Sequence, residues 1–355
     1  MAVSEPRARA PQVSVIIPAR NEEANLGSCL ESLISQDDIP FEIIVVNDHS
    51  TDRTKEIAQS FSRVRVIDAG PLPAGWTGKN NAVATGARAA RTNWFLFTDA
   101  DTVHLRGSLA RALWEAQQYG ADLLSYSPEQ IAMTFWEMAV LPVVFAELAR
   151  QYPPSKVSDP NSPEAAANGQ YILVKREAYE AVGGHAAVAS AILEDVALAR
   201  VIKASGRKII FRYAADAVRT RMYRNFLQLS EGWTKNLSLL FPNPSGVALK
   251  TLSLWALLWV ALFLTSIRPG IYWWSSAFLI VTLFLAIRLR RAHFTPIKNI
   301  VGVFFGMPMF AYLLLRSKRA HAKGNVSWKG RTYKGEAPAA AEAVDQTSVT
   351  AGKLA

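Results

Sequence analysis

The chain has little cysteine: Cys29 is the one cysteine in 355 residues. A lone thiol excludes an internal disulfide and any metal cluster held by several cysteines. Residues 1–11 also lack the apolar run of a secretory signal, so we expect a flexible N-terminus that is not a targeting segment. These absences favour an N-terminal domain that faces the cytoplasm.

Acidic residues are the minority, with 29 Asp and Glu against 39 Lys and Arg and a net charge of +10. Such an excess can indicate nucleic-acid binding. Here the basic residues gather beside the last apolar segments, in the ranges 288–298 and 316–323. Positive-inside bias and attraction to anionic lipid explain that placement, so we predict a membrane partner and no nucleic acid.

Apolar residues make up 50% of the chain and are concentrated in residues 247–315. This region holds three apolar stretches, each near the roughly 17–25 residues that cross a bilayer as a helix: 247–266, 271–287 and 297–315. The region therefore predicts a multi-pass protein of the inner (plasma) membrane, with two or three membrane helices.

The first two stretches are expected to form a hairpin whose tight turn at 267–270 lies outside the cytoplasm. The third contains Gly302, Gly306 and Pro308, which we expect to interrupt its helix, and a full crossing would export the basic residues that follow. We therefore favour a re-entrant or interfacial helix there. Residues 316–355 are then expected to be a cytoplasmic tail, first basic and then disordered.

Residues 13–126 alternate short β-branched or aromatic runs with segments of helical period, the pattern of βαβ units in an α/β fold. A helix from about Glu22 places Cys29 in its core stripe. Four strands are expected, all short and apolar enough to be central, at 13–17, 41–46, 64–67 and 94–97. With a further strand at 171–174, the sequence predicts a mainly parallel sheet in a domain over 12–240.

Two carboxylates, Asp99 and Asp101, directly follow the aromatic strand at 94–97. Ligands of open parallel sheets bind at the carboxyl ends of the strands. Oxygen ligands there suit Mg²⁺ or Mn²⁺, which bind through one or two carboxylates plus substrate phosphates. An isolated pair is more often a solvated turn, but the first two strands also end in polar clusters, at 18–22 and 47–52. Their coincidence favours a site for a nucleotide-bound substrate.

A second acidic pair, Glu194 and Asp195, opens a predicted helix whose core stripe follows at 196–202. Carboxylates in a first helical turn are favoured by the helix dipole by about 0.3–1 kcal/mol. Capping and catalysis are therefore equal alternatives for this pair on position alone.

The apolar helix expected at 131–149 contains Pro142. If it crossed the bilayer, Asp99 and Asp195 would lie on opposite sides, which would separate the two halves of one site. We therefore predict that this helix lies in the membrane interface, close to a membrane-dissolved substrate.

With these motifs in order, the chain resembles family 2 glycosyltransferases of the GT-A fold over nearly all of residues 12–240. The motifs that carry the resemblance are Val15 to Glu23, Val46 to Asp52, Gly78 to Asn80, Thr98 to Asp101 and Leu193 to Asp195. A membrane-attached branch that glycosylates lipids, including ceramide glucosyltransferase-like and hopanoid- or carotenoid-associated enzymes, is similar in four further segments: Gly75 to Lys79, Arg221 to Arg224, Gly232 to Asn236 and Trp328 to Arg331.

The resemblance implies a role for each matching residue. For the donor it implies Pro18, Ala19, Glu22, Asp48, Lys79, Asp99, Asp101, Arg221 and Arg224, with Mn²⁺ or Mg²⁺ held by Asp101 and Asp99. For the acceptor side it implies Gly169, Gln170, Glu194 and Trp233, although core packing is an equal alternative for Trp233. Asp195 would be the general base, kept ionised near Arg221 or Arg224.

The implied function is an inverting, metal-dependent transfer of one sugar from a nucleotide-sugar, usually a UDP-sugar, to a membrane lipid such as a carotenoid, hopanoid or sphingolipid. The segment from Arg221 to Asn225 departs from the Arg-Trp pattern of many relatives, which disfavours a processive polysaccharide synthase. Two alternatives stay open: transfer to a polyprenyl phosphate, and a non-catalytic membrane protein that binds nucleotide-sugars.

Overall fold

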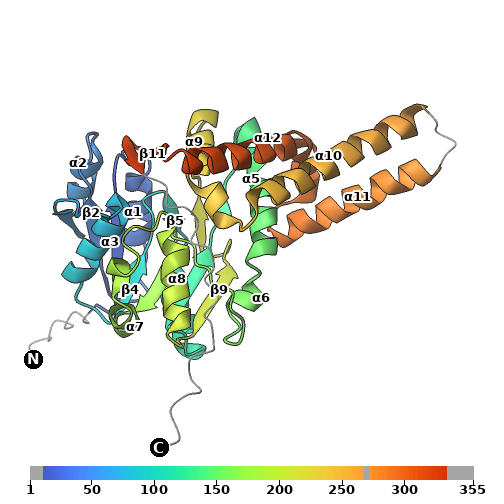
Figure 1. The fold of residues 1–355 in the computed structure, drawn as a ribbon. Coiled ribbons are helices and arrows are strands. Elements are labelled where there is room, and N and C mark those ends of the chain that lie inside the picture. The colour runs from blue at the N-terminus through green and yellow to red at the C-terminus, as the bar shows by residue number, and fades with distance from the viewer. Residues whose placement is uncertain (1–10, 268–271, 334–355) are drawn as a thin grey trace, which may run out of the picture.

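The computed structural model describes residues 11–267 and 272–333. Predictions for residues 1–10, for the turn at 268–270 and for the tail from 334 onward lie outside the described residues. An α/β body is formed by about the first two thirds of the chain, and helices from the C-terminal third extend from one side of it (Figure 1).

A seven-stranded sheet forms the centre of the body, in the order β3-β2-β1-β4-β8-β6-β9. Its strands are β1 (Val13–Ala19), β2 (Phe41–Asn47), β3 (Val64–Asp68), β4 (Trp94–Phe97), β6 (Leu123–Ser127), β8 (Ile172–Lys175) and β9 (Ile209–Tyr213). β8 runs antiparallel to β4 and β6, and the other neighbours are parallel. The mainly parallel sheet predicted from the sequence is confirmed.

β3 departs from the prediction, because it lies at the edge of the sheet rather than at its centre. Its side chains are half-buried or exposed, because β3 has a neighbouring strand, β2, on one side only. A second, three-stranded sheet in the order β5-β10-β7 lies beside the first. Its strands are β5 (Thr102–His104), β7 (Glu129–Gln130) and β10 (Val218–Thr220).

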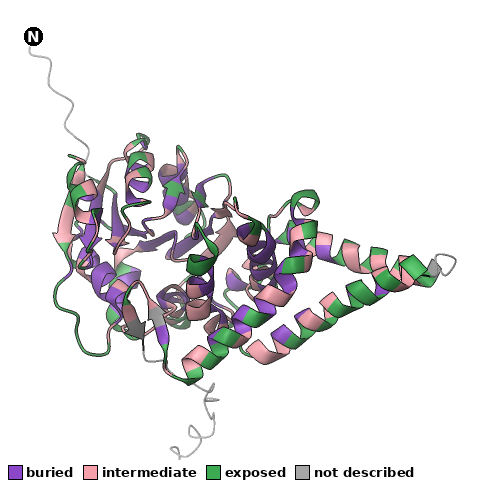
Figure 2. Cartoon of the chain, turned by 90° about the horizontal axis from the view of Figure 1, so that it is seen from above, coloured by how far each residue is buried: buried purple, intermediate pink, exposed green. Residues whose placement is uncertain are grey.

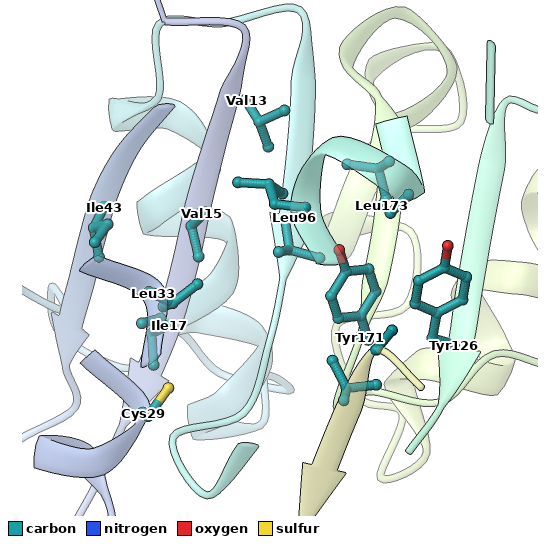
Figure 3. Packing of buried hydrophobic residues seen from close by; sticks show 14 of the residues in the cluster. Val13, Val15, Ile17, Cys29, Leu33, Ile43, Leu96, Tyr126, Tyr171 and Leu173 are labelled. Atoms are coloured by element: carbon teal, nitrogen blue, oxygen red, sulfur yellow. The ribbon is translucent and has the colours of Figure 1, made fainter. Parts of the chain in front are cut away.

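Side chains alternate between the two faces of the central sheet, as the period of a strand requires. Val13, Val15 and Ile17 of β1 pack with one apolar cluster, and Ile16 with the other. Helices α1 (Leu26–Ile34) and α4 (Ser108–Gln118) join the first cluster, part of which is drawn in Figure 3. Helices α3 (Gly78–Ala89), α7 (Arg176–Ala181) and α8 (Glu194–Ala204) join the second.

Helix α1 begins at Leu26, later than predicted, because residues 22–25 form a turn in which the Asn25 amide donates to the Glu22 carbonyl. Asn21 has a positive φ of 51°, so the chain bends sharply there after β1. Cys29 packs in the core as expected, and burial raises the pKa of its thiol. The remaining short elements are α2 (Thr54–Gln59), α6 (Pro154–Val157) and η1 (Gly184–Ala186).

A third apolar cluster joins the body to the C-terminal helices. Its helices are α5 (Phe135–Gln151), α9 (Phe226–Leu240), α10 (Pro244–Ile267), α11 (Tyr272–Arg291) and α12 (Pro296–Ala322). Thr134 and Glu137 form a capping box at the start of α5, and Pro142 lies inside that helix.

Helices α10 and α11 project from the body and expose most of their length (Figures 1 and 2). These two helices and α12 are long and apolar enough to cross a membrane. In the most apolar stretch of each helix, 22% of the residues of α10 and 11% of those of α11 are buried, against 44% in α12. The share is larger in α12 because this helix packs against α5, α9 and α10. A short hairpin of β11 (Val326–Trp328) and β12 (Arg331–Tyr333) follows α12.

Helix α12 is continuous through Gly302, Gly306 and Pro308, so the predicted interruption is absent. The two glycines instead lie against the backbone of α5. A Cβ at Gly302 would come within 3.1 Å of the Met138 carbonyl oxygen, and one at Gly306 would collide with the backbone of Ala139. Small residues thus let the backbones of α12 and α5 approach closely.

We expect Gly306→Ala to lower the melting temperature of the purified protein in detergent, because the added methyl group would push α12 away from α5. Overpacking of this kind typically costs about 1–3 kcal/mol. Gly70→Ala is the matched control, since a Cβ there has no neighbour within 4 Å. Equal melting temperatures for the two variants would contradict the close packing of α5 on α12.

Candidate active site

Two cavities adjoin at the carboxyl ends of β1, β2 and β4. The first, of about 450 Å³, is lined by the ends of these strands and by later segments, including Pro18, Ala19, Glu22, Asp48, Lys79, Asp99, Asp101, Arg224, Lys235 and Arg331. The second, of about 190 Å³, includes Phe145, Tyr152, Gly169, Glu194, Asp195 and Trp233. Lys79, Asp99, Gln170 and Lys235 line both cavities, so the two are parts of one site.

Lys79 lies between the two cavities. The side chain of Thr77 caps helix α3 and places Lys79 in its first turn. The Lys79 ammonium is 2.7 Å from an oxygen of Asp99 and 2.7 Å from an oxygen of Glu194. Burial acts to lower the pKa of Lys79, but Asp99, Glu194 and Asp195 raise it well above the ordinary value. A permanent positive charge therefore links the end of β4 to the start of α8.

Asp101 supplies an oxygen with no hydrogen-bond partner among the described residues. Its Oδ1 is buried, although buried polar atoms are normally satisfied. Burial, followed by repulsion from Asp99 and Glu22, raises the pKa of Asp101 to about 7. The positive charges of Lys329 and Lys79 act against this rise but do not cancel it.

The pair Asp99 and Asp101 fits a divalent metal that also needs ligands from its substrate. Within the described ranges no group of three or more His, Cys, Asp or Glu side chains could hold a metal ion. Mg²⁺ and comparable hard cations use one or two carboxylates plus substrate phosphates. The unpaired oxygen of Asp101 suits a metal whose other ligands come from a phosphorylated substrate.

Asp195 lies at the start of α8, at the wall of the second cavity. Its Oδ2 accepts a hydrogen bond from the Gly169 amide at 2.9 Å, and its Oδ1 accepts one from the Val196 amide at 2.8 Å. Burial, followed by repulsion from Glu194, raises the pKa of Asp195 to about 6, although Lys79 acts against the rise. The carboxylate is held in one orientation and is ready to accept a proton near neutral pH.

The pKa values of the adjacent residues Glu194 and Asp195 are shifted in opposite directions. Burial acts to raise the pKa of Glu194, but Lys79 and Lys235 outweigh it, and the net pKa lies below the ordinary value. Glu194 is therefore the permanent counter-ion of Lys79, whereas Asp195 can change its charge. Capping alone does not account for these contacts.

Gly169 and Gln170 shape the floor of the site. A Cβ at Gly169 would lie 3.1 Å from the Lys79 ammonium nitrogen and 3.4 Å from Asp195 Oδ2. Gln170 is buried. Its side-chain amide donates to Thr220 Oγ1 at 3.2 Å, and its backbone carbonyl accepts a hydrogen bond from Thr98 Oγ1. Gln170 thus ties the strand ends together.

Trp233 lines the second cavity but is almost fully buried, in edge contact with Phe145 and Tyr223. The sequence left open whether this residue packs in the core or faces the acceptor. The structure shows core packing, because Trp233 belongs to the third apolar cluster, and the residue also borders the second cavity.

Arg221 and Arg224, both assigned to the donor from the sequence, have separate positions. Arg221 forms an ion pair with the buried Glu137, with Nε 3.0 Å from Oε1, and it is not among the residues that line either cavity. Arg224 lines the first cavity and donates to Ala24 O and Asn25 Oδ1. We therefore reassign Arg221 to the N-terminal cap of α5, and Lys79 rather than an arginine is the cationic neighbour of Asp195.

Sequence reasoning missed three cationic residues from the later part of the chain that line the first cavity. Lys235 projects from α9, and Lys329 and Arg331 come from the β11–β12 hairpin, far along the chain. The segments Gly232 to Asn236 and Trp328 to Arg331 carry the resemblance, but no periodicity or spacing places them beside the ends of β1 and β2.

The fold and the site define a glycosyltransferase. Residues 14–183 match the profile described as "Glycosyl transferase family 2". The chain is 31% identical to 4,4'-diaponeurosporenoate glycosyltransferase of Staphylococcus aureus (strain USA300) over 343 residues, which cover 90% of this chain and 88% of that protein. The chain belongs to glycosyltransferase family 2.

Solved structures give weaker likenesses. A mannosyltransferase, PcManGT from Pyrobaculum calidifontis in complex with GDP-Man and Mn²⁺, is 16% identical with a TM-score of 0.49 and covers 89% of this chain and 90% of that one. Glucosyl-3-phosphoglycerate synthase from Mycobacterium tuberculosis, in complex with Mn²⁺, UDP and glucosyl-3-phosphoglycerate, is 21% identical with a TM-score of 0.42 and covers 64% and 77%.

The two arginines make a matched pair for testing the reassignment. Arg221→Ala should lower the free energy of unfolding by roughly 1–3 kcal/mol, because it leaves the buried Glu137 carboxylate without its partner. It should leave the KM for the donor nearly unchanged. Arg224→Ala should raise that KM several-fold with little loss of stability. Thermal melts and donor kinetics on both variants decide the matter, and the reverse pattern would show the reassignment to be wrong.

Proposed function

We propose that this glycosyltransferase moves one sugar from a UDP-sugar to a carotenoid-type lipid at the membrane surface, by a single metal-dependent displacement. The observation that carries this proposal is Lys79, which joins Asp99 in the first cavity to Glu194 in the second. Donor and acceptor groups then meet beside the Asp195 carboxylate.

The first cavity suits the nucleotide-sugar. Its walls come from the polar segments that end β1, β2 and β4. Asp48 and Glu22 would contact the nucleoside, and Lys79 would contact the diphosphate. Asp99 and Asp101 would hold Mn²⁺ or Mg²⁺, which when bound would offset the negative charge that develops on the departing diphosphate. Lys79 adds a fixed positive charge without any proton transfer.

The second cavity suits the acceptor. Asp195 borders it on one side, and apolar or aromatic side chains border it on the other, among them Phe145, Leu148, Tyr213 and Trp233. Such a wall fits an apolar chain with a polar end. The relative in Staphylococcus aureus carries a carotenoid acid in its name, which supports a carotenoid-type acceptor here.

The position of the C-terminal helices supports a lipid acceptor. Helices α10 and α11 would span the inner membrane as a hairpin, with the α/β body in the cytoplasm. The beginning of α12 exposes Ile297, Val301 and Phe305, and Phe305 contacts the exposed Phe135 of α5 at 5.7 Å. We infer that α5 and this end of α12 sit in the membrane interface, so that the second cavity lies within reach of a membrane-dissolved acceptor.

The other end of α12 supports an interfacial position for this helix. Arg316 Nη1 donates to Ser230 Oγ at 2.7 Å, and the imidazole of His321 contacts the Lys235 carbonyl at 2.8 Å. Both partners belong to α9, which borders the active site. We infer that the residues after α12 stay on the cytoplasmic side, as the sequence predicted from their charge.

We expect Asp195→Asn to lower turnover on a hydroxylated carotenoid by about 100 to 10,000-fold, since a hydroxyl is a poor nucleophile until a base removes its proton. The assay incubates membranes with Mn²⁺, radiolabelled UDP-glucose and the carotenoid, and counts label in the organic phase. Asp37→Asn, which alters an exposed carboxylate between α1 and β2, is the control. Full turnover by Asp195→Asn would exclude Asp195 as the base.

The same variant distinguishes the two kinds of carotenoid acceptor. A carboxyl-terminated carotenoid is already ionised near neutral pH, so its transfer needs no general base. We expect Asp195→Asn to lose far less activity on that acceptor than on the hydroxylated one. Equal losses on both acceptors would mean that Asp195 positions the substrate instead of accepting a proton.

The pH dependence of kcat/KM follows from the raised pKa of Asp195, which is about 6. A base acts in its ionised form, so activity on a hydroxyl acceptor should increase as the pH rises through 6 and level off above it. Burial destabilises the ionised form, so the free energy of unfolding should decrease as the pH rises from the ordinary carboxyl value of 3.8 to about 6. Activity that falls as the pH rises through this range would contradict the assignment.

A further inference from the structure

The β11–β12 hairpin has an ordered turn that presents two cations to the first cavity. Lys329 and Gly330 form the turn with φ angles of 46° and 76°, and Trp328 pairs with Arg331 on either side of it. Positive φ at both central residues is what a two-residue turn of type I′ requires, and glycine adopts it without strain. The turn holds Lys329 and Arg331 close together at its tip.

The tip is docked on the ends of β1 and β2. The Arg331 guanidinium donates to both carboxylate oxygens of Asp48, the longer bond being 2.9 Å. Lys329 pairs with Glu22 and donates to the Arg20 carbonyl at 3.1 Å, and Arg20 Nε donates back to the Lys329 carbonyl at 3.3 Å.

The docked position leaves little spare room. Any Cβ at Gly78 would collide with the Arg331 guanidinium, so the backbone at the start of α3 is the floor on which Arg331 lies. Trp328 also lines the cavity, and its ring lies 5.8 Å from the Lys235 ammonium. The hairpin therefore contacts α3 and α9 as well as the strand ends.

This docking conflicts with the proposed role of Asp48. The Asp48 side chain is almost fully buried, and each of its carboxylate oxygens already accepts a bond from Arg331. A nucleobase that donates a hydrogen bond to Asp48 must first displace the guanidinium. Removing Arg331 without a replacement would leave the buried carboxylate with the His49 imidazole alone, whose Nδ1 lies 3.3 Å from Oδ1, and the loss of the guanidinium is costly.

We propose that Lys329 and Arg331 are donor-site residues that exchange partners when the nucleotide-sugar binds: the base takes the place of Arg331 at Asp48, and the two cations move to the diphosphate. This inference rests on the uridine-nucleotide donor proposed above. Arginine binds phosphate through two parallel hydrogen bonds, as it binds Asp48 here. Every charge in the exchange keeps a partner, because the base satisfies Asp48 and the diphosphate satisfies the released cations.

The exchange assigns the base to Asp48 and the diphosphate to the two cations. Uridine has only the base and its sugar, whereas UDP also has the diphosphate, so the two ligands test different halves of the exchange. Isothermal titration of the full-length protein in lipid nanodiscs, with Mn²⁺ present, gives the Kd of each ligand. Arg331→Ala removes the competitor at Asp48 and also a cation for the diphosphate. We expect uridine to bind at least about fivefold more tightly and UDP about fivefold more weakly, the size expected for one charge-assisted hydrogen bond.

Two further variants make the result specific. Lys329→Ala should weaken UDP binding several-fold and leave uridine binding nearly unchanged. Lys323→Ala removes an exposed positive charge just before the hairpin and should alter neither affinity. Thermal melts of all three variants test whether a loss of affinity comes from unfolding.

The outcomes separate the two proposals. Equal shifts of uridine and UDP affinity in Arg331→Ala would overturn the exchange, because the cation would then act at Asp48 alone or only hold the hairpin. Unchanged affinities would overturn it as well. If wild-type protein binds GDP but neither uridine nor UDP, the uridine donor itself is wrong, and the exchange at Asp48 is refuted with it.

Discussion

The arrangement of this site depends on the double ion pair that the Lys79 ammonium forms with Asp99 and Glu194. Asp99 follows a strand of the N-terminal half of the body, and Glu194 begins a helix almost a hundred residues later in the chain. Each carboxylate lies 2.7 Å from the same nitrogen. Without that positive charge, Asp99, Glu194 and Asp195 would face one another in a buried space at high electrostatic cost. Lys79 thus makes possible the acidic centre that both substrates would share.

The membrane-associated helices are coupled to this centre by short connections. Helix α12 packs along α5 through glycines and ends beside α9, which supplies Lys235 to both cavities. A few residues further on, the β11–β12 hairpin reaches Asp48. The helix that is proposed to rest in the membrane interface therefore leads directly to the first cavity.

The central part of the fold could be predicted because its signals are local. The β-branched run that starts at Val13 and the aromatic run at Trp94 each specify a strand, and the polar residues that follow them mark the binding edge. The contact between Arg331 and Asp48 joins residues 283 positions apart, and no local pattern encodes such a distance. A motif can also mislead, as Arg221 shows. Its motif suggested the donor site, but its ion pair with the Glu137 carboxylate determines its position.

We propose one displacement at the anomeric carbon, in which an acceptor beside Asp195 replaces the leaving diphosphate. The configuration of the new glycosidic bond tests it most directly, because a single displacement inverts the anomeric carbon. The product made from UDP-α-glucose and a hydroxylated carotenoid should be a β-glucoside, which the coupling of its anomeric proton in an NMR spectrum would reveal. An α-glucoside would contradict the account, since retention needs a second displacement or attack from the face of the leaving group.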